Sequence, residues 1–493
     1  MGLFAKKPLA ELRVEAEKGT LRRALGPVSL TALGIGSVIG TGIFVLTGTA
    51  ASQNAGPALV ISMVIAAAAC ALAGLCYAEL ASMIPVAGSA YTYAYVTVGE
   101  LLAWIIGWDL MLEYALSAAT IAVGWSGYFV SLMHDLGVAI PAALTTAPGT
   151  TVTLPGGAEV AGAFNLPAAV IVLLVCALLL VGIKESANAN AALVVVKVLV
   201  LIVFVVAGAA YINRENLTPF IPPNTGEFGH YGWSGILRGA GVIFFAFIGF
   251  DAVSTAAQEA KNPQRDMPIG ILVSLAICTV LYIAVAIVLT GIVHYSKLDV
   301  ASPLAVGIDA TGLTWLSPFI KVSALFGMFS TMVVQLIGQT RIFYSMSRDG
   351  LLPAAFGRVH PRFRTPYLST LLTSGVIAVA AGLLPITVLS QLVSMGTLLA
   401  FVLACVGILI LRRTAPELER PFRTPGMPWV PILGALACLA QMVGLPWTTW
   451  ERLIIWLALG LAVYFLYSRR RAAEVRGERA GMSRDEGRLV PEP

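Results

Sequence analysis

The sequence has few charged residues. Only 12% of its 493 residues are Asp, Glu, Lys or Arg, whereas 58% are hydrophobic and the mean hydropathy is +0.86. Soluble chains carry about 25% charged residues, and a water-soluble domain with this balance would expose large apolar patches. The composition therefore excludes a soluble enzyme of the Rossmann or TIM-barrel type and predicts an all-α polytopic membrane protein.

Cysteine and histidine are also scarce, and neither forms a pattern that binds a metal or performs catalysis. The six cysteines lie in apolar stretches without a Cys-x-x-Cys pair, which favours small core residues over disulfides or metal ligands. The four histidines are scattered among loops and span ends, and the sequence has no Walker A motif. We therefore expect no metal, no cofactor and no enzymatic activity.

The basic residues are distributed unevenly along the chain. The net charge of +5 is typical of retained cytoplasmic loops and gives no reason to expect nucleic-acid binding. The basic N-terminus also lacks the apolar region and cleavage site of a signal peptide, so none is expected to be removed. Apolar runs of roughly 20 residues predict twelve spans near 28–49, 57–80, 97–131, 165–183, 187–212, 234–258, 267–293, 314–346, 367–385, 388–411, 428–446 and 450–468.

Charge counting supports this span number and predicts the orientation. With both termini cytoplasmic, 25 of the 31 Lys and Arg residues lie on the inner side and four on the outer side, which satisfies the positive-inside rule. By length alone, the stretch 97–131 is either one long tilted helix or two tight spans. Splitting it would invert all later loops and destroy the asymmetry, so we predict one helix there.

The first span contains a glycine-rich segment in its middle. Four glycines occur within nine residues from Gly34 to Gly42, and each costs roughly 1 kcal/mol of helix propensity relative to alanine. The helix is either unwound there or uses Gly36 and Gly40 as a packing face for a neighbouring helix. A dinucleotide-binding loop is not expected, because the spacing is G-x-G-x-x-x-G and no strand precedes it.

The sixth span contains a comparable irregularity. Gly249 and Asp251 interrupt an apolar helix, about 210 residues after the first break. Paired breaks in corresponding spans of two inverted halves indicate a transporter binding site. Unwound helix ends expose N–H groups on one half-helix and C=O groups on the other. This arrangement favours a zwitterion, with its carboxylate near Gly40, Thr41 and Gly42 and its ammonium near the carbonyls of Phe245, Ala246 and Ile248.

Four segments resemble the amino acid-polyamine-organocation superfamily, and most closely its cationic amino acid transporter family in a bacterial twelve-span form. They are GIGSVIGTGIFVLTG in span one, PVAGSAYTYAY after span two, IGFDAVSTAAQEAKNPQRDMPIGI across span six and GQTRIFYSMSRDGLLP after span eight. The resemblance covers roughly residues 20–470. It implies a leucine-transporter-like 5+5 inverted repeat plus two C-terminal helices, and uptake of L-amino acids driven by protons or by exchange.

The resemblance also implies where the substrate binds. It places the substrate carboxylate at Ile39, Gly40, Thr41 and Gly42, and the amine at Phe245, Ala246 and Ile248, with Phe245 as an aromatic gate. Without the resemblance, Phe245 could equally pack in the core or face lipid.

Three ionisable residues within spans are candidates for coupling. Lys197 lies about ten residues into span five, at roughly 15 Å depth, where a lysine costs about 2.5–3.5 kcal/mol without partners. The family supports an ammonium that replaces the cation of sodium-coupled relatives near span one, and the alternative is a structural tether to carbonyls there. Glu113 shares a face of span three with Asp109 and is the candidate proton site, unless both carboxyls only bond neighbouring helices. Asp251 is expected to cap the second half of span six.

Side-chain selectivity is expected at span eight. Gln335 is polar in an apolar run and faces the substrate side chain or makes an interhelical hydrogen bond. Because we find no acidic residue there to bind a cationic head group, the sequence favours neutral amino acids.

Together these features predict a proton-coupled secondary transporter that imports L-amino acids across the plasma membrane by alternating access. Its expected partners are the amino acid, protons and the lipid bilayer, and an accessory subunit cannot be read from the sequence. An exchanger, a uniporter for cationic amino acids and a non-transporting amino acid receptor remain alternatives. The expected units are a cytoplasmic arm (1–27), two five-helix repeats (28–212 and 234–411), spans 11 and 12 (428–468) and a disordered cytoplasmic tail (469–493).

Overall fold

Helices make up nearly all of the chain that the computed structural model describes, which comprises residues 6–7, 25–83, 89–153, 159–182, 187–361, 363 and 365–477. Most of the predicted N-terminal arm and the tail after residue 477 lie outside these residues. Within them, seven helices are long and apolar enough to cross a membrane, and five further apolar helices are shorter. The protein is therefore an integral membrane protein, as its composition predicts.

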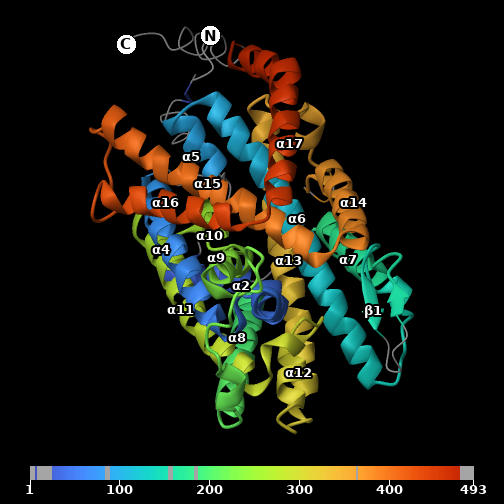
Figure 1. The fold of residues 1–493 in the computed structure, drawn as a ribbon. Coiled ribbons are helices and arrows are strands. Elements are labelled where there is room, and N and C mark those ends of the chain that lie inside the picture. Colours follow the sequence, from blue (N-terminus) through green and yellow to red (C-terminus); the bar gives the residue numbers. More distant parts are fainter. Residues whose placement is uncertain are drawn as a thin grey trace, which may run out of the picture.

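Each of the twelve predicted spans is present as a helix or as a broken helix (Figure 1). The stretch predicted at 97–131 is one continuous helix from Glu100 onward, not two spans, as charge counting predicts. The spans are α2 (Pro27–Val38) continued by η1 (Gly42–Leu46), α3 (Thr47–Ala50) and η2 (Ala51–Ala55); α4 (Leu59–Met83); α6 (Glu100–Asp135); α7 (Leu166–Val181); α8 (Ala187–Ala209); α9 (Gly232–Ile243) continued by η6 (Phe244–Phe247) and α10 (Ala252–Thr255); α11 (Pro263–Ile292); α13 (Leu316–Arg348); α14 (Tyr367–Leu383); α15 (Ile386–Thr414); α16 (Trp429–Gly444); and α17 (Trp447–Val463).

Short elements connect these spans. Helix α5 (Ser89–Thr97) precedes α6, and α12 (Pro303–Asp309) precedes α13. A two-stranded antiparallel hairpin, which the sequence does not predict, pairs β1 (Thr151–Thr153) with β2 (Glu159–Ala161) in the loop after α6. Its Thr and Val residues favour extended backbone. The remaining short helical turns are η3 (Gly56–Ala58), η4 (Ala142–Leu144), η5 (Arg214–Leu217), η7 (Ala257–Glu259), η8 (Tyr295–Lys297), η9 (Ala354–Gly357) and η10 (Tyr464–Ser468).

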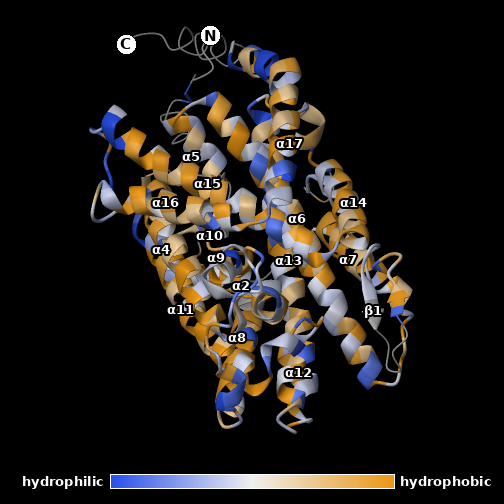
Figure 2. Ribbon diagram, in the orientation of Figure 1, coloured by the Kyte–Doolittle hydropathy of each residue, from blue (hydrophilic) through white to orange (hydrophobic). Residues whose placement is uncertain are grey.

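Hydrophobic residues dominate the middle of the helices, and many of the hydrophilic residues lie toward the two ends of the bundle (Figure 2). Exposed apolar side chains such as Leu199, Val376 and Leu436 lie on α8, α14 and α16. Such residues would be unfavourable in water but match a lipid environment. The exposed apolar surface is thus the lipid-facing surface of the bundle.

Both ends of the described chain meet at one end of the bundle, which we call the terminal face. The Lys7 ammonium pairs with Asp349 at 3.0 Å, and its backbone N–H donates to the Tyr95 carbonyl. The Arg476 guanidinium pairs with Glu100 and also donates to the Tyr95 hydroxyl. Lys7, Arg476 and the segment after α13 therefore lie at the same end of the bundle.

Lys321 marks the other end, which we call the opposite face. Its ammonium pairs with Asp135 at 2.5 Å, so it joins α13 to the end of α6. A lysine near the end of a span is expected to extend alone toward water. The structure instead gives Lys321 a carboxylate partner and buries it almost completely.

Candidate functional site

The two broken spans lie directly against each other. A Cβ added at Gly42 would be 2.3 Å from the Ala246 Cα atom, so the two backbones approach as closely as glycine permits. The Ser37 hydroxyl donates to the Gly249 carbonyl at 2.9 Å, and Gly249 has a φ of +119° that favours glycine. The glycines of span one therefore serve both unwinding and close packing: Gly42 packs against the second break, whereas Gly34 and Gly40 face side chains of α11 and α13.

The first break lies between α2 and η1. Ile39 has an extended backbone, with φ −74° and ψ 97°, so the α-helical hydrogen-bond ladder ends there. Within the described chain, no hydrogen bond is formed by the backbone N–H groups of Gly40 and Thr41. These groups begin a second half-helix, whose first N–H groups have no intrahelical acceptor and carry partial positive charge.

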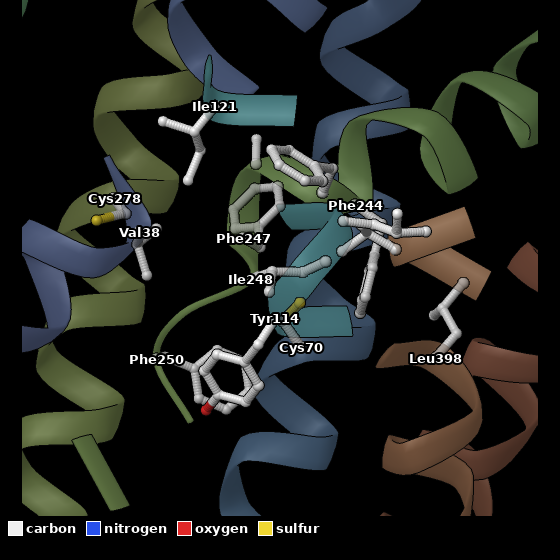
Figure 3. Close-up of a cluster of buried hydrophobic side chains, with 14 of the residues drawn as sticks. Val38, Cys70, Tyr114, Ile121, Phe244, Phe247, Ile248, Phe250, Cys278 and Leu398 are labelled. Carbon is white, nitrogen blue, oxygen red and sulfur yellow. The ribbon is translucent and has the colours of Figure 1, made fainter. Parts of the chain in front are cut away.

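The second break lies between η6 and α10. Ile248 is extended, with φ −67° and ψ 140°, and its N–H donates to the Phe245 carbonyl at 3.2 Å. Among the described residues, no hydrogen bond is found at the Ala246 or Ile248 carbonyl. Figure 3 shows the buried hydrophobic cluster that surrounds this region, with Ile248 and Phe250 from the second break and Val38 from the first.

Side chains from other helices satisfy the carbonyls at the end of α2. Lys197 is only 1% exposed, and its ammonium donates to the Gly36 carbonyl at 2.8 Å and the Ile39 carbonyl at 3.2 Å. The Thr331 hydroxyl bonds the Lys197 ammonium at 3.0 Å and contacts the same two carbonyls. This places Lys197 beside span one, as the sequence predicts. A cation at a helix C-terminus is stabilised by the partial negative charge there.

Two residues that sequence reasoning missed take part in this arrangement. Thr331 lies on the same face of α13 as Gln335, one turn earlier, and Tyr282 on α11 donates its hydroxyl to the Val38 carbonyl at 2.9 Å. A threonine in the apolar run before Gln335 is a detectable signal for the first residue. Tyr282 carries no such signal because tyrosines are common in spans.

Three buried carboxyl groups lie on the terminal side of the breaks. Asp109 and Glu113 occupy successive turns of α6, and Thr397 on α15 lies within hydrogen-bonding reach of Glu113. In the part of the chain that the structure describes, neither carboxyl oxygen of Asp109 has a hydrogen-bond partner, nor does Oε2 of Glu113. Buried carboxyls in this situation are typical of proton-carrying sites.

The prediction that the Asp251 side chain caps the second half of span six is wrong. Asp251 occupies the N-cap position of α10, but its carboxylate makes no capping hydrogen bond there. The Tyr114 hydroxyl on α6 instead donates to Asp251 Oδ2 at 3.4 Å. The carboxylate therefore contacts span three, where it lies close enough to Glu113 for the two charges to interact.

Gln335 was predicted either to face the substrate side chain or to make an interhelical hydrogen bond, and the structure shows the hydrogen bond. Its amide nitrogen donates to the Ser117 hydroxyl on α6 at 2.9 Å. The remaining predicted substrate residues, Ile39, Thr41, Phe245, Ala246 and Ile248, are all at most 5% exposed. The predicted binding residues of spans one and six therefore meet in one buried region, whereas Gln335 belongs to the α6–α13 contact.

Two facing broken helices inside a membrane bundle, with a buried lysine against one of them, define a membrane transporter of the broken-helix class. The family comparison agrees, because the model named "Amino acid permease" matches residues 25–464. The chain belongs to this amino acid permease family, which has the leucine-transporter-like fold and consists of transporters rather than enzymes.

The chain is similar to several characterised transporters. It is 48% identical over 469 residues to the methylthioribose transporter of Bacillus subtilis, covering 95% of this chain and 98% of the relative. It is 46% identical to the branched-chain amino acid permease BcaP of the same organism, with the same coverage of both chains. It is 38% identical to the vacuolar cationic amino acid transporter 4 of Arabidopsis thaliana, covering 80% of this chain and 64% of the relative.

Proposed function

We propose that this protein is a proton-coupled secondary transporter that imports L-amino acids with neutral side chains by alternating access. The observation that carries the proposal is the contact of two helix breaks that offer opposite backbone dipoles. The N–H groups of Gly40 and Thr41 suit a carboxylate, and the carbonyls of Ala246 and Ile248 suit an ammonium. Recognition by backbone groups reads the constant part of an amino acid and leaves its side chain to a separate contact.

The preference for neutral side chains follows from the residues around the breaks. Phe245, Ile248 and the cluster in Figure 3 are apolar. The nearest carboxyls are those of Glu113 and Asp251, which we assign to coupling. A guanidinium or ammonium head in an apolar region without a dedicated carboxylate would be costly. Neutral aliphatic substrates also agree with the substrate named for the branched-chain relative.

The coupling ion in this proposal is a proton. Lys197 supplies a permanent positive charge to the carbonyls of Gly36 and Ile39, which removes the need for a sodium ion there. Glu113 is the proton carrier, because it is buried beside the hydroxyl of Thr397 and near Asp251. Protonation of Glu113 reduces the repulsion between neighbouring carboxylates, so it changes how α6 packs against the second break.

The membrane orientation and the repeat organisation belong to the same proposal. The terminal face carries the chain ends and the basic segment after α13, so the positive-inside rule assigns this face to the cytoplasm of a plasma membrane. The two repeats, 28–212 and 234–411, each begin with a broken span, and the last two spans, 428–468, lie outside them. Alternating access then consists of movement of the broken spans relative to α6 and α13.

A second candidate substrate is methylthioribose, which is favoured by the 48% identical relative of that name. Methylthioribose has neither a carboxylate nor an ammonium, so it would use the exposed backbone groups only as neutral hydrogen-bond partners. Exchange of amino acids, uniport of cationic amino acids and a non-transporting receptor role remain alternatives to proton symport.

Counterflow in proteoliposomes tests these alternatives directly. The purified protein is reconstituted, and accumulation of labelled alanine and labelled leucine is measured with and without a pH gradient. Neutral amino acids are expected to compete, and an inward proton gradient is expected to accelerate uptake. Competition by arginine alone would overturn the neutral preference, competition by methylthioribose alone would replace the substrate class, and exchange without any pH effect would indicate an antiporter. Binding without counterflow would indicate a receptor.

A further inference from the structure

A polar cavity of about 180 Å³ lies on the opposite face, above the two breaks. Since one water occupies roughly 30 Å³ of liquid, the cavity has room for about six waters, or for a zwitterion the size of alanine or serine. It is bounded by the outer halves of both broken spans and by the start of α15. The residues that line it are Leu46, Thr49, Gln53, Asn54, His230, Arg238, Val242, Thr387, Ser390, Gln391 and Pro446.

The cavity has a positive electrostatic character. Arg238 on α9 supplies a permanent charge, and none of the lining residues is Asp or Glu. Thr387 and Ser390 belong to the first turns of α15, a helix of 29 residues whose N-terminal end contributes partial positive charge. Two exposed carboxylates lie at the rim: Asp299 accepts a hydrogen bond from the Gln53 amide at 2.9 Å, and Glu227 lies 3.6 Å from the His230 ring. The charge on the lining itself is positive, so an anionic group in contact with Arg238 is favoured there over a cationic one.

Arg238 is held in a defined position. Its Nε atom donates to the Gly444 carbonyl at 3.2 Å, and its guanidinium lies 5.4 Å from the centre of the Phe228 ring. Gly229 has a φ of +90°, and a Cβ added there would be 2.1 Å from the Arg238 Nε atom. No carboxylate of the described chain lies within ion-pair distance of Arg238. A charged side chain in a span without an ionic partner is by default a candidate functional residue.

The lining of the cavity lies close in sequence to both breaks. Leu46 lies four residues after Gly42, and Val242 lies three residues before Phe245, so each is one helical turn, about 5 Å, from a residue of the breaks. The N–H groups of Thr41 and Gly40 lie five and six residues before Leu46 along the same broken span, on its side toward the membrane centre.

We propose that this cavity is a first binding station on the opposite face, where Arg238 binds the carboxylate of an incoming amino acid and repels cationic side chains. The inference rests on the proposed amino acid transport and deepens it, because it adds a second binding site and a selection step before the breaks. Thr387, Ser390 and Gln391 offer hydroxyl and amide groups to the rest of the zwitterion.

The experiment measures uptake of labelled leucine into vesicles that present either the opposite face or the terminal face to the substrate. Arg238→Gln is expected to raise KM from the opposite face about tenfold, the loss expected for one charge-assisted hydrogen bond, and to leave KM from the terminal face unchanged. Arginine is expected to compete better against leucine in this variant. Arg238→Lys keeps the charge and is expected to restore most of the affinity.

Arg214→Gln is the matched control, because Arg214 is an exposed arginine that does not line the cavity. It removes the same charge and is expected to leave both KM values unchanged. An Arg238→Gln KM that is unchanged from the opposite face, or raised equally from both faces, would overturn the proposal, since the second result indicates an effect on the fold or on the central site. Failure of amino acid transport itself would instead appear as inactive wild-type protein.

Discussion

Lys197 is the residue whose environment most constrains the mechanism. Its ammonium is the donor to two buried carbonyls of the first break and contacts the Thr331 hydroxyl. Removing it leaves these groups without that donor, and each unsatisfied buried group costs about 1–3 kcal/mol. We expect Lys197→Ala to abolish amino acid uptake in proteoliposomes across a pH series. Uptake at the wild-type rate would remove Lys197 from the mechanism.

Lys321→Ala is the control for this substitution, because Lys321 is also a buried lysine of a span but pairs with Asp135 at the opposite face. Its removal leaves a partly exposed carboxylate that water can solvate. The expected result is uptake close to that of the wild-type protein. This result would show that the loss of uptake in Lys197→Ala depends on the position of that lysine and not on removing any buried lysine.

Glu113 gives the transporter its predicted pH dependence. If Glu113 must be protonated for the loaded carrier to change conformation, uptake rises as the external pH falls, because acid increases the protonated fraction. Glu113→Gln mimics the protonated carboxyl and cannot titrate. We expect it to bind substrate normally, measured by equilibrium binding, and to lose the stimulation of uptake by acid.

Asp135→Asn, which changes a carboxylate at the end of the same helix, is expected to retain the wild-type pH profile. An acid-stimulated Glu113→Gln variant would place the coupling proton on another group, with Asp109 and Asp251 as the remaining buried carboxyls described near it.

The surroundings of a single residue could be predicted from the sequence only where its chemistry leaves few alternatives. A lysine deep in an apolar span must have partners, and the family resemblance implies that Lys197 finds them near span one. The direction of the Asp251 side chain depends on the backbone dihedral angles of Ile248 and Gly249, which the sequence does not specify. Thr331 was missed because its importance comes from two carbonyls almost 300 residues earlier in the chain.

Among the secondary-structure elements, the contact between the breaks depends on a glycine. A methyl group at Gly42 would overlap the Ala246 backbone, and backbone atoms cannot move aside as a flexible side chain can. We expect Gly42→Ala to separate the two breaks and to abolish counterflow while the protein still inserts into the membrane. Membrane fractionation and counterflow measure the two properties separately.

Gly375→Ala is the matched control within an unbroken span. Gly375 lies in α14, and a Cβ there would meet nothing within 4 Å. The substitution is expected to be neutral or stabilising by up to about 1 kcal/mol. Full counterflow by Gly42→Ala would show that close contact of the breaks is unnecessary.

The spans themselves were largely predictable, because their apolar length and the charge asymmetry of their loops are properties of the sequence. The breaks were predictable as irregularities at glycines, but unwinding and packing could not be separated without the neighbouring helix. The hairpin of β1 and β2 and helix α5 were not predicted. Short elements in loops have weak periodicity and are defined mainly by tertiary contacts.

For the molecule as a whole, a buried ion pair joins distant parts of the bundle. The fully buried Glu79 carboxylate on α4 accepts two hydrogen bonds from Arg412, at 3.0 and 2.7 Å, and one from the Thr424 N–H at 2.7 Å. Removing one partner of such a pair costs about 3–5 kcal/mol. Glu79→Ala is therefore expected to lower the thermal unfolding midpoint in detergent markedly.

The exposed pair of Arg471 and Glu474 provides the comparison, since exposed pairs contribute about 0–1 kcal/mol. Glu474→Ala is expected to leave the midpoint unchanged within error. Equal midpoints for Glu79→Ala and the wild-type protein would mean that the segment after α15 is held to α4 by apolar contacts alone.

The shared contacts of Lys7 and Arg476 with Tyr95 have a consequence for biosynthesis. Arg476, whose guanidinium bonds the Tyr95 hydroxyl of α5, is translated 381 residues after that tyrosine. The terminal face therefore completes these contacts only after α17 has been translated. A nascent chain that stalls before residue 476 leaves Glu100 without this arginine, and such a chain offers quality-control proteases an incompletely closed surface.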